Sequence, residues 1–208
     1  MLLWLLVPLA ALLGYVAGRY QAAQFQNEGE ALVRAAIGDA LVGKAWHLLN
    51  NITLPVEDGT TQVDHILVSR YGIFVIETKH YKGWVFGDAH SRQWTQVLFK
   101  RKHRFQNPLH QNYKHVKAIQ SLLEFLPPNH VESLVVFTGE AEFKSKKPEG
   151  VHSLDSMLIH LKSYDVEIIT ENRMQFCVGR LECQRLALTR ETDIEHRQNL
   201  DRRHGNAP

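Results

Sequence analysis

The stretch TQVDHILVSRYGIFVIETKHY spans residues 61–81 and reads as two strands joined by a tight turn. Apolar and β-branched residues dominate the two arms, which we expect to cover residues 62–68 and 73–79. Three charged residues interrupt this apolar pattern: Asp64, Glu77 and Lys79. Where they lie in the hairpin decides what the stretch can do.

The turn fixes the positions of these charges. With Arg70 and Tyr71 as the two turn residues, every facing pair of the hairpin is determined. Asp64 then lies opposite Glu77, with the two side chains about 5 Å apart on one face. Lys79 lies two residues further on and therefore shares that face. A slip of one residue would separate the two carboxylates. The other residues divide into two sets: Ile66, Val68, Ile73 and Val75 share the face of the charges, and His65, Leu67, Phe74, Ile76 and Thr78 form the opposite face.

Two facing carboxylates beside apolar side chains repel each other unless a cation lies between them. Hard oxygen ligands at this spacing suit Mg²⁺ or Mn²⁺, whose remaining positions water and a substrate phosphate can fill. A neighbouring lysine can orient or deprotonate a water molecule, or stabilise a pentavalent phosphate. Metal-assisted hydrolysis of a phosphodiester uses this set of groups. The alternative is a partly exposed hairpin in which Glu77 and Lys79 form an ordinary ion pair.

The pattern of Asp64 followed by Glu77-Thr78-Lys79 resembles the D…(D/E)xK signature of the restriction-endonuclease-like superfamily. Over residues 27–139 the chain also resembles the nuclease-related domain family, often called NERD. The matching segments are Gly29-Glu30, TQVDH at 61–65, GIFVIETK at 72–79, Gly83-Trp84-Val85 with a lone Trp94, and NPxxQ at Asn107, Pro108 and Gln111. The resemblance implies an α/β fold with a restriction-endonuclease-like mixed central sheet flanked by helices.

The resemblance also implies roles for individual residues. Asp64 and Glu77 would hold Mg²⁺ or Mn²⁺, and the main-chain carbonyl of Thr78 would be a further ligand. Lys79 would position or deprotonate the attacking water. Gln111 would orient the site from the helix that follows the NPxxQ segment.

Glu30 has two interpretations. We expect a helix over residues 27–41, with Asn27 as its N-cap and Glu30 as the partner residue of a capping box. Glu30 also begins the apolar stripe of this helix that faces the sheet. In the superfamily an acid on the first helix often completes the metal site. Glu30 is therefore either a metal ligand or a capping glutamate.

The formal net charge of +2 gives no global basic character, so any electrostatic footprint for nucleic acid has to be local. The dense basic run is Lys100, Arg101, Lys102, His103 and Arg104. It is either a solvated loop or a contact for the phosphates of DNA. In the helix that follows, relatives carry Q-x-x-x-Y, whereas this chain has His115 at the position of the tyrosine. His115 is either a phosphate donor or a surface histidine.

The rest of the chain predicts alternating strands and helices. A buried strand over residues 131–138 follows a helix, which predicts a parallel crossover. The two cysteines have no C-x-x-C spacing, which argues against a zinc site on paired cysteines and against a disulfide framework. The further expected elements are strands over 46–54, 81–86, 93–100 and 151–153, helices over 108–126, 154–162 and 171–189, a charged loop over 141–150, and a short strand or extended lead-in over 166–170.

The N-terminus predicts a membrane anchor. Residues 1–18 carry no charged side chain, and as a helix they would span about 27 Å of a bilayer core of about 30 Å. Basic residues follow the segment and none precedes it, so the positive-inside rule places the domain on the cytoplasmic side of a bacterial-type inner membrane. A cleaved signal peptide and a buried soluble helix are the alternatives. The expected organisation is an anchor at 1–19, a linker at 20–26, the nuclease-like domain at 27–189 and a polar, disordered tail at 190–208.

Three functions are consistent with these features. The first is a membrane-tethered nuclease that hydrolyses DNA with a divalent metal, in DNA processing or defence. The second is a non-catalytic nucleic-acid-binding or scaffold domain with the same fold. The third is a membrane-anchored adaptor that binds protein, for which the sequence offers no distinct motif.

Overall fold

The structure is a computed structural model that describes residues 28–57, 59–187, 192, 194 and 198. The predicted anchor at 1–19, the linker at 20–26 and nearly all of the tail at 190–208 lie outside these residues. Within the described part, no helix has both the length and the apolar character needed to cross a membrane.

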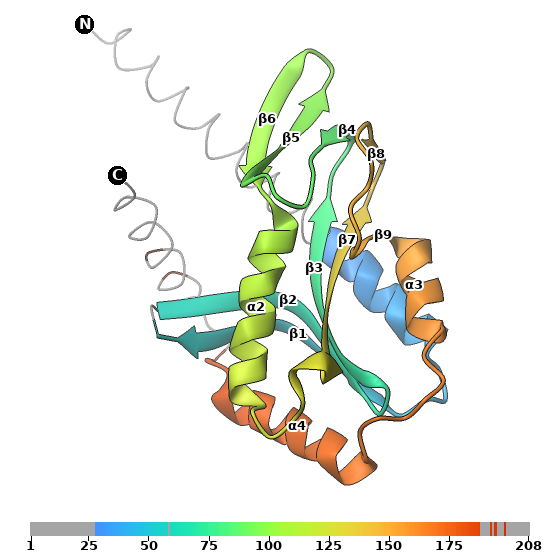
Figure 1. The fold of residues 1–208 in the computed structure, drawn as a ribbon, viewed down its shortest axis with the longest axis vertical. Coiled ribbons are helices and arrows are strands. Elements are labelled where there is room, and N and C mark those ends of the chain that lie inside the picture. The colour runs from blue at the N-terminus through green and yellow to red at the C-terminus, as the bar shows by residue number, and fades with distance from the viewer. Residues whose placement is uncertain (1–27, 58, 188–191, 193, 195–197, 199–208) are drawn as a thin grey trace, which may run out of the picture.

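The described residues form a mixed α/β fold with two mixed sheets flanked by helices (Figure 1). A helix over residues 28–40 comes first. The strands are β1 (Trp46–Val56), β2 (Gly59–Ser69), β3 (Gly72–His80), β4 (Gly83–Phe86), β5 (Gln93–Leu98), β6 (Arg101–Gln106), β7 (Val131–Thr138), β8 (Ala141–Phe143) and β9 (Val151–Ser153). The further helices are α2 (Pro108–Leu122), the short 3-10 helix η1 (Pro128–His130), α3 (Leu154–Lys162) and α4 (Glu171–Gln184).

The central sheet has five strands in the order β1-β2-β3-β7-β9. Strands β1, β2 and β3 pair antiparallel, and β3, β7 and β9 pair parallel, so the predicted parallel crossover is confirmed. The predicted register of the hairpin is also confirmed, from Ser69 opposite Gly72 to His65 opposite Ile76. The alternation of residues along β2 and β3 therefore determines which side chains point to each face of the central sheet.

Helices cover both faces of the central sheet (Figure 1). Helices α2 and α4 pack on the face that carries Ile66, Val68, Ile73 and Val75. The helix over 28–40 and α3 pack on the opposite face, which carries Leu67, Phe74 and Ile76. The two apolar sets predicted from the hairpin thus belong to two separate cores.

The small sheet has four strands in the order β6-β5-β4-β8 and extends beyond the end of the central sheet (Figure 1). Its buried side packs in a third core around Trp94, which is fully buried and stacks on Phe137 with the ring centroids 6.1 Å apart. Gly87 allows this packing, because a Cβ at that position would lie 2.3 Å from the indole ring of Trp94. The lone tryptophan of the motif is therefore a core residue.

Several expected boundaries are wrong. The basic run lies mostly on β6 rather than in a loop, and residues 141–150 include the short strand β8. Of the two alternatives for residues 166–170, the structure excludes the strand and leaves the lead-in to α4. Helix α2 ends at Leu122 instead of 126. Helix α4 ends at Gln184 instead of 189, because the chain becomes extended there and the Leu186 N–H donates to the carbonyl of Thr53.

Gly29 lets the first helix approach the central sheet closely. A Cβ at Gly29 would lie 2.5 Å from Cβ of His80 and 2.7 Å from Oγ1 of Thr138. His80 and Thr138 are themselves joined by a hydrogen bond of 2.8 Å between Nδ1 and Oγ1. Any larger residue at 29 therefore has to push the helix away from two linked strands.

A pair of glycine substitutions in this helix tests the close approach. We expect Gly29→Ala to lower the free energy of unfolding by about 1–3 kcal/mol, because it overpacks a rigid contact. Gly38→Ala is the matched control, since nothing lies within 4 Å of its Cβ position. It should raise stability by up to about 1 kcal/mol through helix propensity. Urea unfolding measures both, and equal effects would contradict the packing argument.

Candidate active site at the fork between β2 and β3

Strands β2 and β3 pair only near their turn. The ladder between them ends at His65 and Ile76, whereas β2 stays paired with β1 as far as Gly59 and β3 stays paired with β7 as far as His80. The two strands therefore diverge, and Figure 1 shows β1 and β2 leaving to one side while β3 and β7 continue in another direction. Asp64 and Glu77, the next residues on the two strands, lie where this fork opens.

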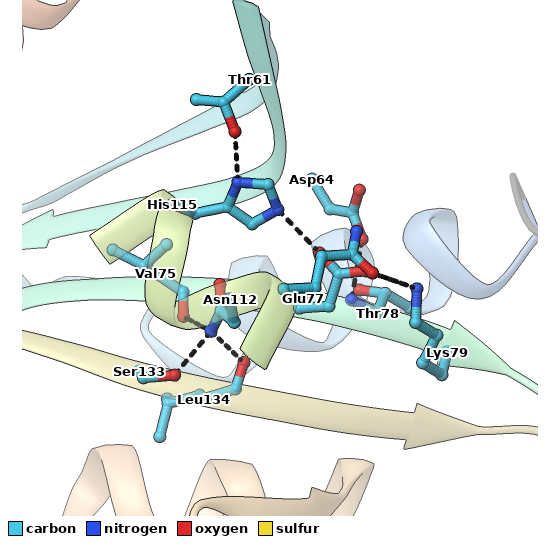
Figure 2. A network of polar contacts seen from close by, with 11 residues as sticks. Thr61, Asp64, Val75, Glu77, Thr78, Lys79, Asn112, His115, Ser133 and Leu134 are labelled. Atoms are coloured by element: carbon cyan, nitrogen blue, oxygen red, sulfur yellow. Dashed lines mark hydrogen bonds and ion pairs between the residues drawn. The ribbon is translucent and has the colours of Figure 1, made fainter. Parts of the chain in front are cut away.

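Asp64 bridges the fork. Its Oδ2 accepts a hydrogen bond of 2.7 Å from the main-chain N–H of Thr78 (Figure 2). Burial raises the pKa of Asp64 well above its ordinary value, and the negative charge of Glu77 raises it further. Asp64 and Glu77 therefore lie close enough for the charge of one to affect the pKa of the other, and a side chain rather than the strand ladder connects β2 to β3 at this point.

Glu77 and Lys79 form a buried ion pair. Nζ of Lys79 lies 2.5 Å from Oε1 of Glu77, and the side chains are 14% and 2% exposed. Burial alone would raise the pKa of Glu77, but the ammonium of Lys79 and the contact with His115 outweigh it and lower that pKa. Burial would lower the pKa of Lys79, yet the charges of Glu77 and Asp64 raise it. The ion pair considered from sequence is therefore present, but it is buried rather than partly exposed.

Helix α2 supplies two further side chains to the fork. Oε1 of Gln111 accepts a hydrogen bond of 3.2 Å from Nζ of Lys79. Nε2 of His115 lies 3.3 Å from Oε2 of Glu77, and its Nδ1 lies 2.7 Å from the hydroxyl of Thr61 on β2 (Figure 2). His115 is buried, so the expectation of a surface histidine is wrong. Its contact with Glu77 makes it a support for the acid.

Asn112 anchors α2 to the central sheet, a role that sequence reasoning missed. Its fully buried amide donates to the carbonyls of Val75 and Leu134 and to the hydroxyl of Ser133, at 2.8, 3.1 and 2.9 Å (Figure 2). A signal was present, because Asn112 and His115 occupy the stripe of α2 that is otherwise apolar. Polar residues on a buried stripe need partners, and these two find them on the strands below.

Glu30 lies at the border of the site, next to a polar cavity of about 200 Å³. Burial raises the pKa of Glu30, a hydrogen bond from Asn51 opposes this, and the charge of Glu77 adds to it. Asn51 adopts a left-handed conformation with φ of 52°. The expected cap, Asn27, lies outside the described residues, so the capping role of Glu30 stays a prediction. The cavity is lined by Glu30, Ala31, Arg34, Asn50, Asn51 and His65.

His65 lines this cavity from the strand beside Asp64. Its Nδ1 lies 2.8 Å from Oδ1 of Asn50, while its Nε2 is buried without a hydrogen-bond partner. Burial, together with the positive charge of Arg34, lowers the pKa of His65 to about 4. The imidazole is therefore neutral near pH 7.

The predicted nucleic-acid-binding lysines and arginines lie apart from the fork. Lys100 follows β5 in the hairpin turn, and Arg101, Lys102 and Arg104 lie on β6. All four are exposed. The β5–β6 hairpin rises from the N-terminal end of α2, the end of the helix that carries Gln111 (Figure 1).

The donor chemistry of the fork fits Mg²⁺ or Mn²⁺. Within the described residues, no group of three or more His, Cys, Asp or Glu side chains forms a ready-made metal cage. Mg²⁺ needs no such cage, because one or two carboxylates plus water and substrate oxygens suffice. Oε2 of Glu77 is buried and lies 3.3 Å from Nε2 of His115 without meeting hydrogen-bond geometry, which leaves acceptor capacity for a cation. Asp64 and Glu77 are thus the residues that could hold the ion.

A mixed sheet that places an aspartate on one strand and Glu-x-Lys on the next defines the restriction-endonuclease-like class. The profile of the family described as "Nuclease-related domain" matches residues 26–138, more than half of the chain, and the chain belongs to this family. An uncharacterized protein of Bacillus anthracis is 48% identical over 97 residues, which make up 46% of this chain and 45% of that protein. The chain therefore spans less than half the length of this relative.

The anchoring role of Asn112 can be measured. We expect Asn112→Ala to lower the free energy of unfolding by about 1–3 kcal/mol, because it leaves buried carbonyls without a donor. Lys114→Ala is the matched control on the exposed side of the same helix and should change stability by no more than about 0.5 kcal/mol. Urea denaturation of both variants compares them, and a loss at Asn112 no larger than at Lys114 would refute the anchor.

Proposed function

We propose that the protein is a divalent-metal-dependent nuclease that hydrolyses phosphodiester bonds in DNA. The observation that supports it best is the meeting of Asp64, Glu77 and Lys79 in one buried fork, with Gln111 in contact with the lysine. Family membership supports a nuclease-like hydrolase in general terms. The metal, the DNA substrate and the catalytic roles are our inference from these groups.

In the proposed mechanism Asp64 and Glu77 would hold Mg²⁺ or Mn²⁺, and the carbonyl of Thr78 and the carboxylate of Glu30 would be further ligands. The ion would supply an activated water and stabilise charge on the phosphate. Lys79, kept as an ammonium by Glu77, donates hydrogen bonds that position the water or a phosphate oxygen.

Gln111 and His115 act as positioning residues. Gln111 on α2 accepts a hydrogen bond from Nζ of Lys79, which limits the directions that the lysine can take. His115 contacts Oε2 of Glu77 and is itself held by Thr61, which limits the rotation of the acid. We therefore place His115 behind the carboxylate and no longer among the phosphate donors.

A non-catalytic nucleic-acid-binding or scaffold domain is the second candidate. One observation favours it: Glu77 and Lys79 form a buried ion pair, which is also what a purely structural pair would look like. This candidate predicts salt-sensitive binding of DNA without cleavage, and binding that Lys79→Ala leaves unchanged.

Cleavage by the full chain tests the catalytic proposal. We expect Mg²⁺- or Mn²⁺-dependent cutting of a panel of single-stranded, nicked, branched and duplex DNA. Glu77→Gln and Lys79→Ala should each lower the rate by about 100-fold or more, because each removes a group needed at the reacting phosphate. Lys117→Ala is the control, an exposed lysine on α2. Gel assays with and without EDTA measure the rates.

Two outcomes would count against catalysis. Folded protein that cuts no substrate of the panel with either metal would contradict it. So would cutting that Glu77→Gln leaves intact, since a contaminating nuclease would then be the source. Titration calorimetry separates the second candidate, because a scaffold domain should bind neither ion at the fork, whereas the proposed enzyme should lose its binding heat in Glu77→Gln.

We also propose that residues 1–19 tether the domain to a bacterial-type inner membrane, with the domain in the cytoplasm. The support is the uncharged apolar run at residues 1–18, followed by basic residues. The full chain should stay in the membrane pellet after an alkaline carbonate wash, and a variant that lacks residues 2–19 should move to the supernatant. If the protein expressed from the full sequence is recovered without its N-terminal residues, a cleaved signal peptide is indicated instead.

A further inference from the structure

The face of the small sheet opposite its core carries two exposed aromatic rings. Residues that face each other across paired strands point to the same side of a sheet. The registers therefore place two rows on one face: Trp84, Val97 and Lys102 in the first, and Phe86, Thr95 and Arg104 in the second. We call these six residues the aromatic face.

The aromatic face is open to solvent. The intervening residues Val85, Trp94 and Phe105 point to the other side and are buried in the third core. Trp84 is 50% exposed and Phe86 is 39% exposed. Exposed apolar side chains that lie together and are bordered by polar residues can mark a binding surface.

The charges on this face are mainly positive. Lys102 and Arg104 are exposed and end the two rows. Nζ of Lys144 lies over the ring of Trp84, 4.9 Å from its centroid, and it also pairs with Glu142. Glu142 faces Trp84 from β8, so it neutralises Lys144 and leaves Lys102 and Arg104 as the net positive charge of the rows.

We propose that the aromatic face binds a single-stranded segment of nucleic acid, with unpaired bases stacked on Trp84 and Phe86 and backbone phosphates on Lys102 and Arg104. The inference rests on the proposed nuclease function for its substrate. Trp84 and Phe86 are two residues apart on β4, which separates them by about 6.6 Å along the strand, enough for neighbouring bases to take one ring each. In a duplex the base faces are already stacked, so this arrangement selects unpaired strands.

The position of the face also suits a path to the fork. Strand β6 leads through Asn107 directly into α2, which carries Gln111 at its first turn. The small sheet lies at the end of the molecule toward which β3 runs, and β3 carries Glu77 and Lys79 (Figure 1). A strand held on the small sheet is therefore delivered to the side of the molecule where the candidate catalytic residues lie.

Binding without metal tests the aromatic face independently of cleavage. Fluorescence anisotropy of the full chain in EDTA should show tighter binding of labelled oligothymidylate than of a duplex of the same length. Trp84→Ala and Phe86→Ala should each weaken the binding of the single strand about 5- to 150-fold, the range for loss of one stacked base, and leave duplex binding unchanged. Trp84→Phe should restore most of the affinity. Phe176→Ala, a 59% exposed ring on α4, is the control and should change nothing.

Charge variants test the phosphate contacts. Lys102→Ala and Arg104→Ala should each reduce the slope of log affinity against log salt by about 0.7. Glu142→Gln should instead tighten binding of the single strand, because it removes a carboxylate from the face and releases Lys144 from its ion pair. Lys162→Ala at the end of α3 is the matched control, and its slope should equal that of the unmodified chain.

Three results would overturn the proposal. The first is unchanged binding of the single strand in Trp84→Ala and Phe86→Ala. The second is an equal loss on duplex, which would mean that the face holds phosphates and no bases. The third is an effect of these variants on binding to phosphatidylglycerol vesicles in place of oligonucleotides, which would make the face a lipid-binding surface. If cleavage fails while base stacking holds, only the nuclease function is refuted. Loss of the stacking result with metal-dependent cleavage intact refutes only the aromatic face.

Discussion

The opening between β2 and β3 is bridged by the hydrogen bond from the Thr78 N–H to the carboxylate of Asp64. Where the ladder stops, a main-chain donor of β3 would face the gap, and an unpaired buried donor costs on the order of 1–3 kcal/mol. Oδ2 of Asp64, on the neighbouring strand, accepts the hydrogen bond from this donor. The same bond holds the acid beside β3, so the group that satisfies the donor at the break in the sheet also lies near Glu77.

The charges in the fork depend on each other because Glu77 is buried and Asp64 and Lys79 are only partly exposed, so water screens them weakly. A lone buried carboxylate is strongly disfavoured, and removing one partner of a buried ion pair typically costs 3–5 kcal/mol. Lys79 interacts favourably with both Glu77 and Asp64, and the two acids disfavour each other. Helix α2 is fitted to this arrangement, since its buried stripe turns from apolar side chains in the first core to Asn112 and His115 above the fork.

Local pattern was enough to predict the hairpin, its register and the two faces that its apolar residues cover, because alternation along a strand is a property of neighbouring residues. It could not predict that the ladder ends after His65, because that end depends on β1 and β7 pulling the two strands apart. The burial of His115 depends in the same way on Thr61, 54 residues away. Strand β6 was not predicted because its first four residues, 101–104, are all exposed. Its sequence therefore lacks the alternation of apolar and polar residues that predicts a strand.

The motif residues of the family divide into two physical kinds. Gly29, Trp94 and Asn107 permit packing: the glycine admits the first helix, the indole fills the third core, and Asn107 caps α2 while its amide donates to the carbonyl of Ser91. Residues of this kind establish the fold and leave the activity open. Asp64, Glu77 and Lys79 are of the other kind. Apolar side chains of similar volume often serve stability as well as a buried ion pair does, so packing alone gives no reason for three charges at one point of a core strand pair. That excess of buried charge over structural need is the physical ground for assigning chemistry to the fork.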